Sequence, residues 1–298
     1  MDVSSLSQFL STLQHQKKYS IHTITNYNRD INQFLTYAKE GLNDSFNDLT
    51  KRSCKHYLYF LDAKNYVPST IHRKISALRS YWRFMCKKQI VSTNPWTQLI
   101  LPKKPKLLPL TLDLSAIQKM LDHIPPTSPL AIRNRALLEL LFSSGLRVSE
   151  LATLKLKNIH ITYNELKIIG KGNKERIVFF GEEAKKRIQE YLVIARPELE
   201  KKPSDTVFIS KTGSPIGSRT IQRLIKTVSA ELKLNLDISP HTFRHSFATE
   251  LHQGGANLRT IQRLLGHESL STTQIYTKVL PKKLLETYRK FENESHNF

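Results

Sequence analysis

Residues 164–180, NELKIIGKGNKERIVFF, are the stretch in which this sequence departs most clearly from a helical pattern. Apolar runs at positions 168–169 and 177–179 flank the glycine-rich, basic segment GKGNK. Short apolar runs on both sides of such a turn predict a β-hairpin. Because most of the remaining chain shows helical spacing of apolar residues, the predicted fold is mainly α with a small β-sheet.

The first hundred residues show helical periodicity and almost no other pattern. Ser20 is placed to cap a helix in which apolar residues recur every three or four positions, at Ile21, Ile24, Tyr27, Ile31 and Phe34. Pro68 and Ser69 open a further helix, with Ile71, Ile75, Leu78, Trp82 and Met85 on one side and Arg73, Lys74 and Arg83 on the other.

A proline-rich segment, residues 94–110 (NPWTQLILPKKPKLLPL), interrupts the helical pattern, because four prolines cannot all lie inside one helix. We therefore predict a helical domain over 1–100, a linker over 101–111, a second domain over 112–281 and a C-terminal segment over 282–298. Lys103, Lys104 and Lys106 make the linker basic. It is either an ordinary surface loop or a strap along a phosphate backbone, and its charge favours the strap.

The second domain begins with a largely apolar helical run over 131–142, and another helix starts at about Arg147. After the predicted hairpin, helices resume at Glu182. The segment DTVFIS, residues 205–210, predicts a short strand. From Ser218 onward the pattern is helical again. These elements predict an α/β second domain next to an all-helical first one.

The chain is strongly basic, with 298 residues and a net charge of +21. Residues 1–106 carry 17 basic and 6 acidic side chains, and the remaining residues carry 29 and 19, so the excess is spread over both predicted domains. Two cysteines do not make a disulfide scaffold. No long apolar stretch predicts a membrane span, and the N-terminus lacks the basic region of a signal peptide. We expect a cytoplasmic protein that binds nucleic acid and no membrane.

Four segments of the second domain carry chemically versatile residues: SGLRVSEL (144–151), IIGKGNKER (168–176), SPHTFRHSFATEL (239–251) and LLGHESLSTTQIY (264–276). Each segment alone has an ordinary explanation. Arg147 could form a weak surface ion pair with Glu150, and GKGNK could be a solvated hairpin tip. His241 and His245 have the spacing of a helical metal pair, but with no HExxH motif and no nearby cysteine we predict no metal site.

Together, the four segments have a common chemical logic. Two arginines, a lysine and two histidines can bind a phosphodiester and stabilise the charge of its transition state. His241 and Arg244 are three positions apart on one predicted helix, so both can face one anion. Tyr276 offers a nucleophile that can form a covalent phosphoryl-enzyme intermediate. Because no carboxylate cluster is present to bind two metal ions, we expect no metal and no cofactor.

In order and spacing, the four segments resemble the signature motifs of the tyrosine recombinase family, and in particular its Xer branch. The helical N-terminal part also resembles the core-binding, SAM-like DNA-binding domain of that family. The resemblance implies that Arg147 is the first catalytic arginine, Lys171 the hairpin lysine and Glu150 a supporting acid. It further implies that His241 and Arg244 form the HxxR pair, that His267 is the second histidine and that Tyr276 is the nucleophile.

The resemblance implies DNA strand exchange through a 3′-phosphotyrosyl intermediate, without ATP or metal. Lys171 would protonate the leaving 5′-oxygen, with Lys174 or Arg176 of the same hairpin as the alternative, and His241 would manage the tyrosine proton. The family's two domains form a C-shaped clamp around DNA, with four protomers on two recombination sites. The family's major-groove helix resembles SRTIQRLIK (218–226), so Arg219 is expected to contact DNA together with Lys103 and Lys104. In the family a helix like 282–298 docks on a neighbouring protomer, whereas packing on its own domain is the alternative.

Several functions remain compatible with the resemblance. The first is resolution of chromosome dimers at cell division, with a copy of the chain or a paralogous recombinase as partner, and with a septal DNA translocase as a further candidate partner. Such a protein would be cytoplasmic and associated with the nucleoid. The alternatives are an integrase or resolvase of a phage or mobile element, a non-catalytic DNA-binding homologue, and a type IB topoisomerase.

Overall fold

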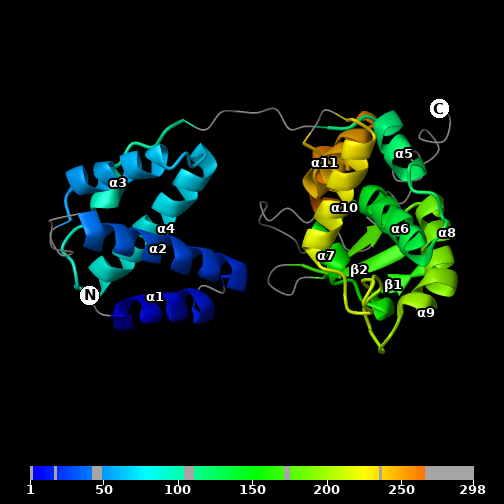
Figure 1. Cartoon of the computed structure of the whole chain (residues 1–298), viewed down its shortest axis with the longest axis horizontal. Helices are drawn as coiled ribbons and strands as arrows, with labels where there is room; N and C mark the ends of the chain where they lie inside the picture. The colour runs from blue at the N-terminus through cyan, green and yellow to red at the C-terminus, as the bar shows by residue number, and fades with distance from the viewer. Residues whose placement is uncertain are drawn as a thin grey trace. The chain divides into compact units, whose positions relative to one another are not determined.

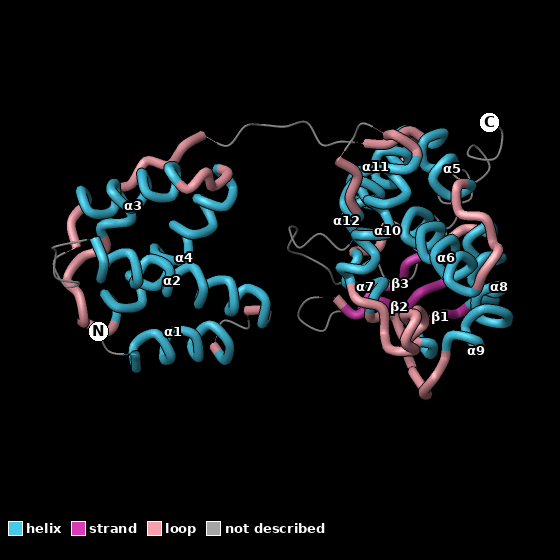
Figure 2. Tube along the Cα trace, in the orientation of Figure 1, coloured by secondary structure: helices cyan, strands magenta, loops and turns pink. Residues whose placement is uncertain are grey.

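A computed structural model describes residues 3–16, 19–41, 49–103, 111–170, 175–234 and 237–265 of the chain. The chain divides into two compact units, Met1–Leu107 and Leu108–Phe298 (Figure 1). The described strands all belong to the second unit, and helices dominate both (Figure 2). The prediction of a mainly α fold with a small sheet is therefore confirmed. None of the described helices combines the length and apolar character that a membrane span needs.

The first unit contains four α-helices and a short 3₁₀-helix among its described residues. They are α1 (Val3–His15), α2 (Ile21–Gly41), α3 (Lys51–Ala63), α4 (Pro68–Lys87) and η2 (Pro95–Gln98). The Ser20 hydroxyl accepts a hydrogen bond from the Thr23 amide at 3.2 Å, which is the predicted cap of α2. Pro68 lies in the first turn of α4, where its missing N–H has no helical partner to lose.

An aromatic cluster forms the centre of the first unit. Phe34 contacts Tyr57, Trp82 and Trp96 edge to face, with ring centroids 4.9, 5.4 and 4.9 Å away. The predicted apolar side of α4 is buried along its whole length. In α2 the prediction is wrong for Ile21, which is 78% exposed, because the buried part of this helix lies one turn or more beyond its first residue.

The prediction that Lys74 lies on the polar side of α4 is wrong, because its side chain is buried. Its ammonium donates to Asp30 Oδ1 at 3.0 Å and to the Gln33 side-chain oxygen, and it lies 4.8 Å from the centroid of the Tyr66 ring. Arg73 pairs with the other carboxylate oxygen of Asp30, which is fully buried. The buried charges are tolerated because each has an opposite partner and hydrogen bonds.

The second unit surrounds a three-stranded antiparallel sheet with helices (Figures 1 and 2). Its elements up to the sheet's last strand are α5 (Leu114–Asp122), α6 (Pro129–Ser144), α7 (Val148–Ala152), η3 (Leu156–Asn158), β1 (Ile159–His160), η4 (Ile161–Tyr163), β2 (Glu165–Ile169) and β3 (Glu175–Phe179). Those that follow are α8 (Glu182–Glu190), the π-helical η6 (Tyr191–Ala195), α9 (Arg196–Leu199), α10 (Ser218–Glu231), α11 (Pro240–Gln253) and α12 (Leu258–Leu265).

The predicted hairpin is confirmed as β2 and β3. Leu166 pairs with Val178, Ile168 with Arg176, and Ile169 with Glu175. Residues 171–174 of its turn, including Lys171, lie outside the described residues. The two-residue strand β1, which the sequence did not predict, pairs with the start of β2.

The predicted strand over residues 205–210 is wrong. Only isolated bridges form there, between Lys155 and Thr206 and between Ile209 and Pro215. Side chains satisfy much of this backbone instead. The Tyr191 hydroxyl donates to the Val207 carbonyl at 3.0 Å and accepts from the Ile209 amide at 3.2 Å. A buried apolar segment therefore lies here without a regular strand partner.

Candidate active site

Arg147 and Glu150 lie at the start of α7, directly after α6. Arg147 is the N-cap residue of α7, and its amide donates to Glu150 Oε2 at 2.8 Å. Its guanidinium donates to Glu150 Oε1 at 2.9 Å. The side chain of Arg147 is 38% exposed, whereas that of Glu150 is only 9% exposed. The alternative of a weak surface ion pair is therefore wrong, because the carboxylate is enclosed by protein.

Arg176 also belongs to this site, although the sequence suggested it only as an alternative to Lys171 for the proton transfer. Its Nη1 and Nη2 donate to the two oxygens of Glu150 at 2.9 and 2.8 Å, and its Nε donates to the Leu264 carbonyl at 3.2 Å. The signal was present in the alternation of β3, because Arg176 pairs with the buried Ile168 and so shares the inner face of the hairpin with Val178.

The pKa of Glu150 reflects this enclosure. Burial alone would raise the pKa of the carboxyl group, but hydrogen bonds and charge from Arg176, together with the Arg147 amide, lower it below its usual value. Glu150 therefore remains ionised at neutral pH and holds both arginines.

Arg244 comes from α11, nearly one hundred positions after Arg147. Ser239 caps this helix by accepting from the Thr242 amide, and Pro240 occupies its first turn. The side chain of Arg244 is buried, and it donates through Nη1 to the Gly145 carbonyl at 2.7 Å and through Nη2 to the Leu265 carbonyl. The contact joins Arg244 to Gly145, which lies two positions before Arg147 in the chain.

The charge of Arg147 acts on Arg244. Burial and the nearby charge of Arg147 lower the pKa of Arg244 to about 10, although Glu150 opposes this shift. Arg244 is still protonated at neutral pH. The site therefore presents cationic groups from two helices with one supporting carboxylate, which suits an anionic ligand.

Gly145 makes the approach of these helices possible. It ends α6 with a left-handed φ of 59°, a conformation that non-glycine residues rarely adopt. A Cβ atom at this position would lie 2.3 Å from Cδ1 of Phe247 and 3.1 Å from Cδ2 of Leu265. The backbone of α6 can therefore contact α11 only where residue 145 has no side chain.

Gly145→Ala is expected to destabilise the second unit by about 2–5 kcal/mol, because the left-handed conformation costs about 1–2 kcal/mol and overpacking about 1–3 kcal/mol. Calorimetry of the full chain would measure the loss. The control is Gly217→Ala, because a Cβ at Gly217 has nothing within 4 Å. Equal transition temperatures for the two variants would contradict this account of Gly145.

The other predicted site residues are placed as follows. His241 is exposed in the first turn of α11, the helix that carries Arg244, and His245 is also exposed. No group of residues suited to bind a metal occurs in the described part of the chain. Arg219, at the start of α10, and Lys103 are exposed. Four further predicted site residues, Lys104, Lys171, His267 and Tyr276, lie outside the described residues.

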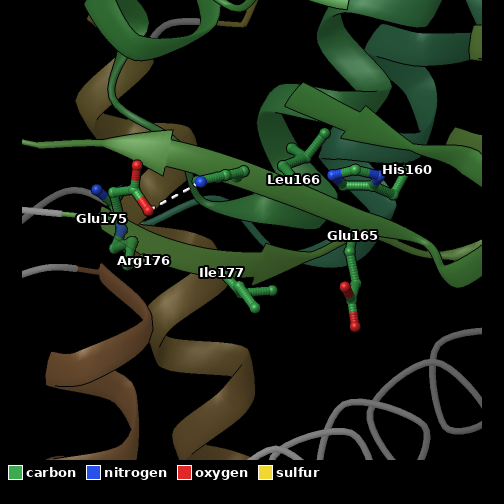
Figure 3. Close-up of a pocket in the computed structure, with 7 residues that line it drawn as sticks. His160, Glu165, Leu166, Glu175, Arg176 and Ile177 are labelled. Carbon is green, nitrogen blue, oxygen red and sulfur yellow. Dashed lines mark ion pairs between the residues drawn. The ribbon is translucent and has the colours of Figure 1, made fainter. Parts of the chain in front are cut away.

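An open hollow of about 400 Å³ lies on the sheet next to this site (Figure 3). It is lined by His160, Glu165, Leu166, Lys167, Glu175, Arg176 and Ile177. An ion pair of 2.9 Å joins Lys167 on β2 to Glu175 on β3 across the hairpin. Arg176 lines this hollow and also binds Glu150.

Comparisons with known proteins cover nearly the whole chain. The sequence model of the phage integrase family matches residues 111–283, and that of the phage integrase N-terminal SAM-like domain matches residues 6–89. Tyrosine recombinase XerC of Halalkalibacterium halodurans is 39% identical over 290 residues, which cover 95% of each chain. Tyrosine recombinase XerD of the same organism is 35% identical over 290 residues, covering 97% of each chain.

The fold is also similar to a crystal structure of the XerH site-specific recombinase bound to difH substrate. That similarity has a TM-score of 0.69 at 23% identity, and covers 93% of this chain and 83% of the other. Together with the sequence matches, it agrees with the helical first unit and the α/β second unit described above. The chain belongs to the phage integrase family, the family of the tyrosine recombinases.

Proposed function

We propose that this protein is a site-specific tyrosine recombinase that cuts and rejoins double-stranded DNA. The observation that carries the proposal is that Arg244 binds the carbonyl of Gly145, two positions before Arg147, so that the charge of Arg147 acts on Arg244 although the two segments lie far apart in the chain. Two cationic forks next to each other can bind the non-bridging oxygens of one phosphodiester and stabilise the additional negative charge of its transition state.

In the proposed reaction, the Tyr276 oxygen attacks the scissile phosphorus and the bond to the 5′-oxygen breaks, leaving a 3′-phosphotyrosyl link. His241 manages the proton of the tyrosine, and Lys171 protonates the leaving 5′-oxygen. His267 adds a hydrogen bond to the phosphate. The 5′-hydroxyl of a partner strand then reverses the step, so the bond energy is retained and no ATP is needed.

For the biological role, we propose resolution of chromosome dimers at cell division. Support comes from the relatives of the chain, which carry the names XerC and XerD. The proposed assembly has four protomers, of this chain or with a paralogue, clamped on two recombination sites in the nucleoid. A septal DNA translocase is the proposed accessory partner.

Recovery of covalent protein–DNA adducts from the host genome, followed by sequencing of the junctions, tests both the activity and the role. Adducts at a single chromosomal site support chromosome-dimer resolution. Adducts at the ends of a mobile element would assign the protein to that element. Failure to recover adducts of the unchanged protein, together with normal DNA binding, would favour a non-catalytic DNA-binding protein.

DNA binding is expected to depend steeply on salt, because basic residues exceed acidic ones in both units. A protein that neutralises 6–10 phosphates loses roughly 10³–10⁵-fold in affinity between about 50 and 200 mM salt. Fluorescence anisotropy over this range measures the slope. A shallow slope would mean that most of the positive charge does not contact phosphates, and would contradict the proposed clamp.

Removal of residues 282–298 is expected to weaken cooperative binding to two adjacent half-sites more than binding to a single half-site. The segment carries Leu284, Leu285, Tyr288 and Phe291 at helical spacing, an apolar face suited to a neighbouring protomer. Gel shifts on full and half sites measure the difference. Equal losses on both DNAs would instead assign the segment to its own domain.

A further inference from the structure

We propose that Arg176 is a positioning residue that fixes the guanidinium of Arg147 through the carboxylate of Glu150. The inference rests on the proposed recombinase function, and concerns a residue that binds no phosphate in the mechanism above. Arg176 lies on β3, whereas Arg147 and Glu150 lie at the start of α7. The ion pair thus joins the hairpin that carries Lys171 to the segment that carries Arg147.

The geometry at Glu150 is that of a carboxylate shared by two arginines. Each of its oxygens accepts one hydrogen bond from Arg176 and one from Arg147, and all four distances lie between 2.8 and 2.9 Å. Paired N–H donors on both oxygens fix the plane of a carboxylate as well as its position. With that plane fixed, Oε1 holds the Arg147 guanidinium in one orientation.

The charges give Arg176 a second effect. Glu150 paired only with Arg147 would neutralise that arginine and compete with the DNA phosphate for its donors. With Arg176 included, the cluster of Arg147, Arg176, Arg244 and Glu150 contains three positive charges and one negative charge. Because Arg176 is only 14% exposed in its side chain and Glu150 9%, water screens this compensation weakly.

Arg176 is itself anchored at the end of α12. The last carbonyls of a helix have no partner within the helix. Arg176 Nε donates to the Leu264 carbonyl, and Arg244 donates to that of Leu265, the next residue. All three nitrogens of the Arg176 guanidinium therefore have acceptors. A lysine keeps the charge but presents a single ammonium, which cannot reproduce the planar fork on Glu150 together with the bond to α12.

The test compares Arg176→Lys with the unchanged chain in single-turnover cleavage. The probe is a nicked duplex that carries the genomic site recovered from adducts of the unchanged protein. It is made either with a normal scissile phosphate or with a methylphosphonate, in which an uncharged methyl group replaces one non-bridging oxygen. Absence of adducts with the unchanged protein would refute the proposed function itself, before any variant is compared.

On the normal phosphate, we expect Arg176→Lys to slow cleavage roughly 100-fold, a typical effect of losing one oriented donor to a transition state. On the methylphosphonate, which carries less charge for Arg147 to stabilise, the slowing should fall below about 10-fold. Half-saturating DNA concentrations should stay unchanged. Should Arg176→Lys fail to fold, Arg176→Gln takes its place, because it keeps a donor for Glu150 without the charge, and the same two ratios are expected.

The matched control is Arg196→Lys. Arg196 is another buried arginine of the second unit, and it binds the Glu200 carboxylate at 2.7 Å and the Ser204 carbonyl at 2.7 Å, outside the arginine cluster. This variant should cleave both DNAs at the rate of the unchanged chain. Equal slowing of Arg176→Lys on the two DNAs, or equal slowing by Arg196→Lys, would reduce Arg176 to a general contribution to stability and overturn the proposal.

Discussion

A protein carrying Tyr276→Phe is expected to bind its target DNA as tightly as the unchanged chain and to form no covalent protein–DNA adduct. The substitution keeps the aromatic ring and removes only the phenolic oxygen, which is the proposed nucleophile. A nicked suicide duplex analysed on a denaturing gel measures the adduct, and a gel shift measures binding. The loss should be complete within the sensitivity of the gel.

The matched control for this prediction is Tyr163→Phe. Tyr163 is an exposed tyrosine of the second unit, and the same phenolic oxygen is removed there. This variant should form the adduct at the rate of the unchanged chain. A persistent covalent band with Tyr276→Phe would show that another residue attacks the phosphate, and a band lost with Tyr163→Phe would move the nucleophile to η4.

Lys171→Ala is expected to slow cleavage by a factor on the order of 10²–10⁴, the usual contribution of a general acid. The proposed acid protonates the 5′-oxygen as it leaves. DNA with sulfur at this bridging position has a leaving group that needs no proton. Such DNA should therefore restore cleavage to Lys171→Ala, as measured by single-turnover kinetics on the oxygen and sulfur substrates.

The controls for Lys171 are other basic residues whose substitution could also slow cleavage. Arg147→Ala and Arg244→Ala remove charge stabilisation rather than a proton, so sulfur should leave both variants impaired. Lys174, in the same turn, is the alternative acid, and rescue of Lys174→Ala in place of Lys171→Ala would transfer the role. Arg176 is a poor candidate for the acid, because its guanidinium is committed to Glu150 and Leu264.

The elements that could be predicted from the sequence are those specified by local patterns. These are the apolar periodicity of α2 and α4, the proline that starts α4, and the basic segment between β2 and β3. Each of these patterns can be recognised in a short stretch of the sequence. The family resemblance located Arg147 and Arg244, whose positions the structure describes. It could not show that Glu150 is shared, because the partner, Arg176, is 26 positions away.

What the sequence missed depends on contacts between distant segments. Residues 205–210 have the composition of a strand, but their backbone is satisfied by isolated bridges and by the side chains of distant residues such as Tyr191 and Arg133. From the sequence around it, Lys74 is expected to be solvated. The structure shows that it is buried next to Asp30, which lies 44 positions away in the chain. A buried charge is thus not recognisable from local spacing when its counter-charge lies on another helix.

Arg147 and Arg244 differ in which sequence changes would disturb their positions. Arg244 is held by the main-chain carbonyls of Gly145 and Leu265, so no side-chain functional group is needed to hold it, but residue 145 must remain a glycine for its backbone to reach α11. The orientation of the Arg244 side chain is therefore set by the path of the backbone. Arg147 is held by the carboxylate of Glu150, so one base change in that codon can release it. During divergence, the placement of Arg244 therefore depends on the backbone path at Gly145, whereas that of Arg147 depends on the side chains of Glu150 and Arg176.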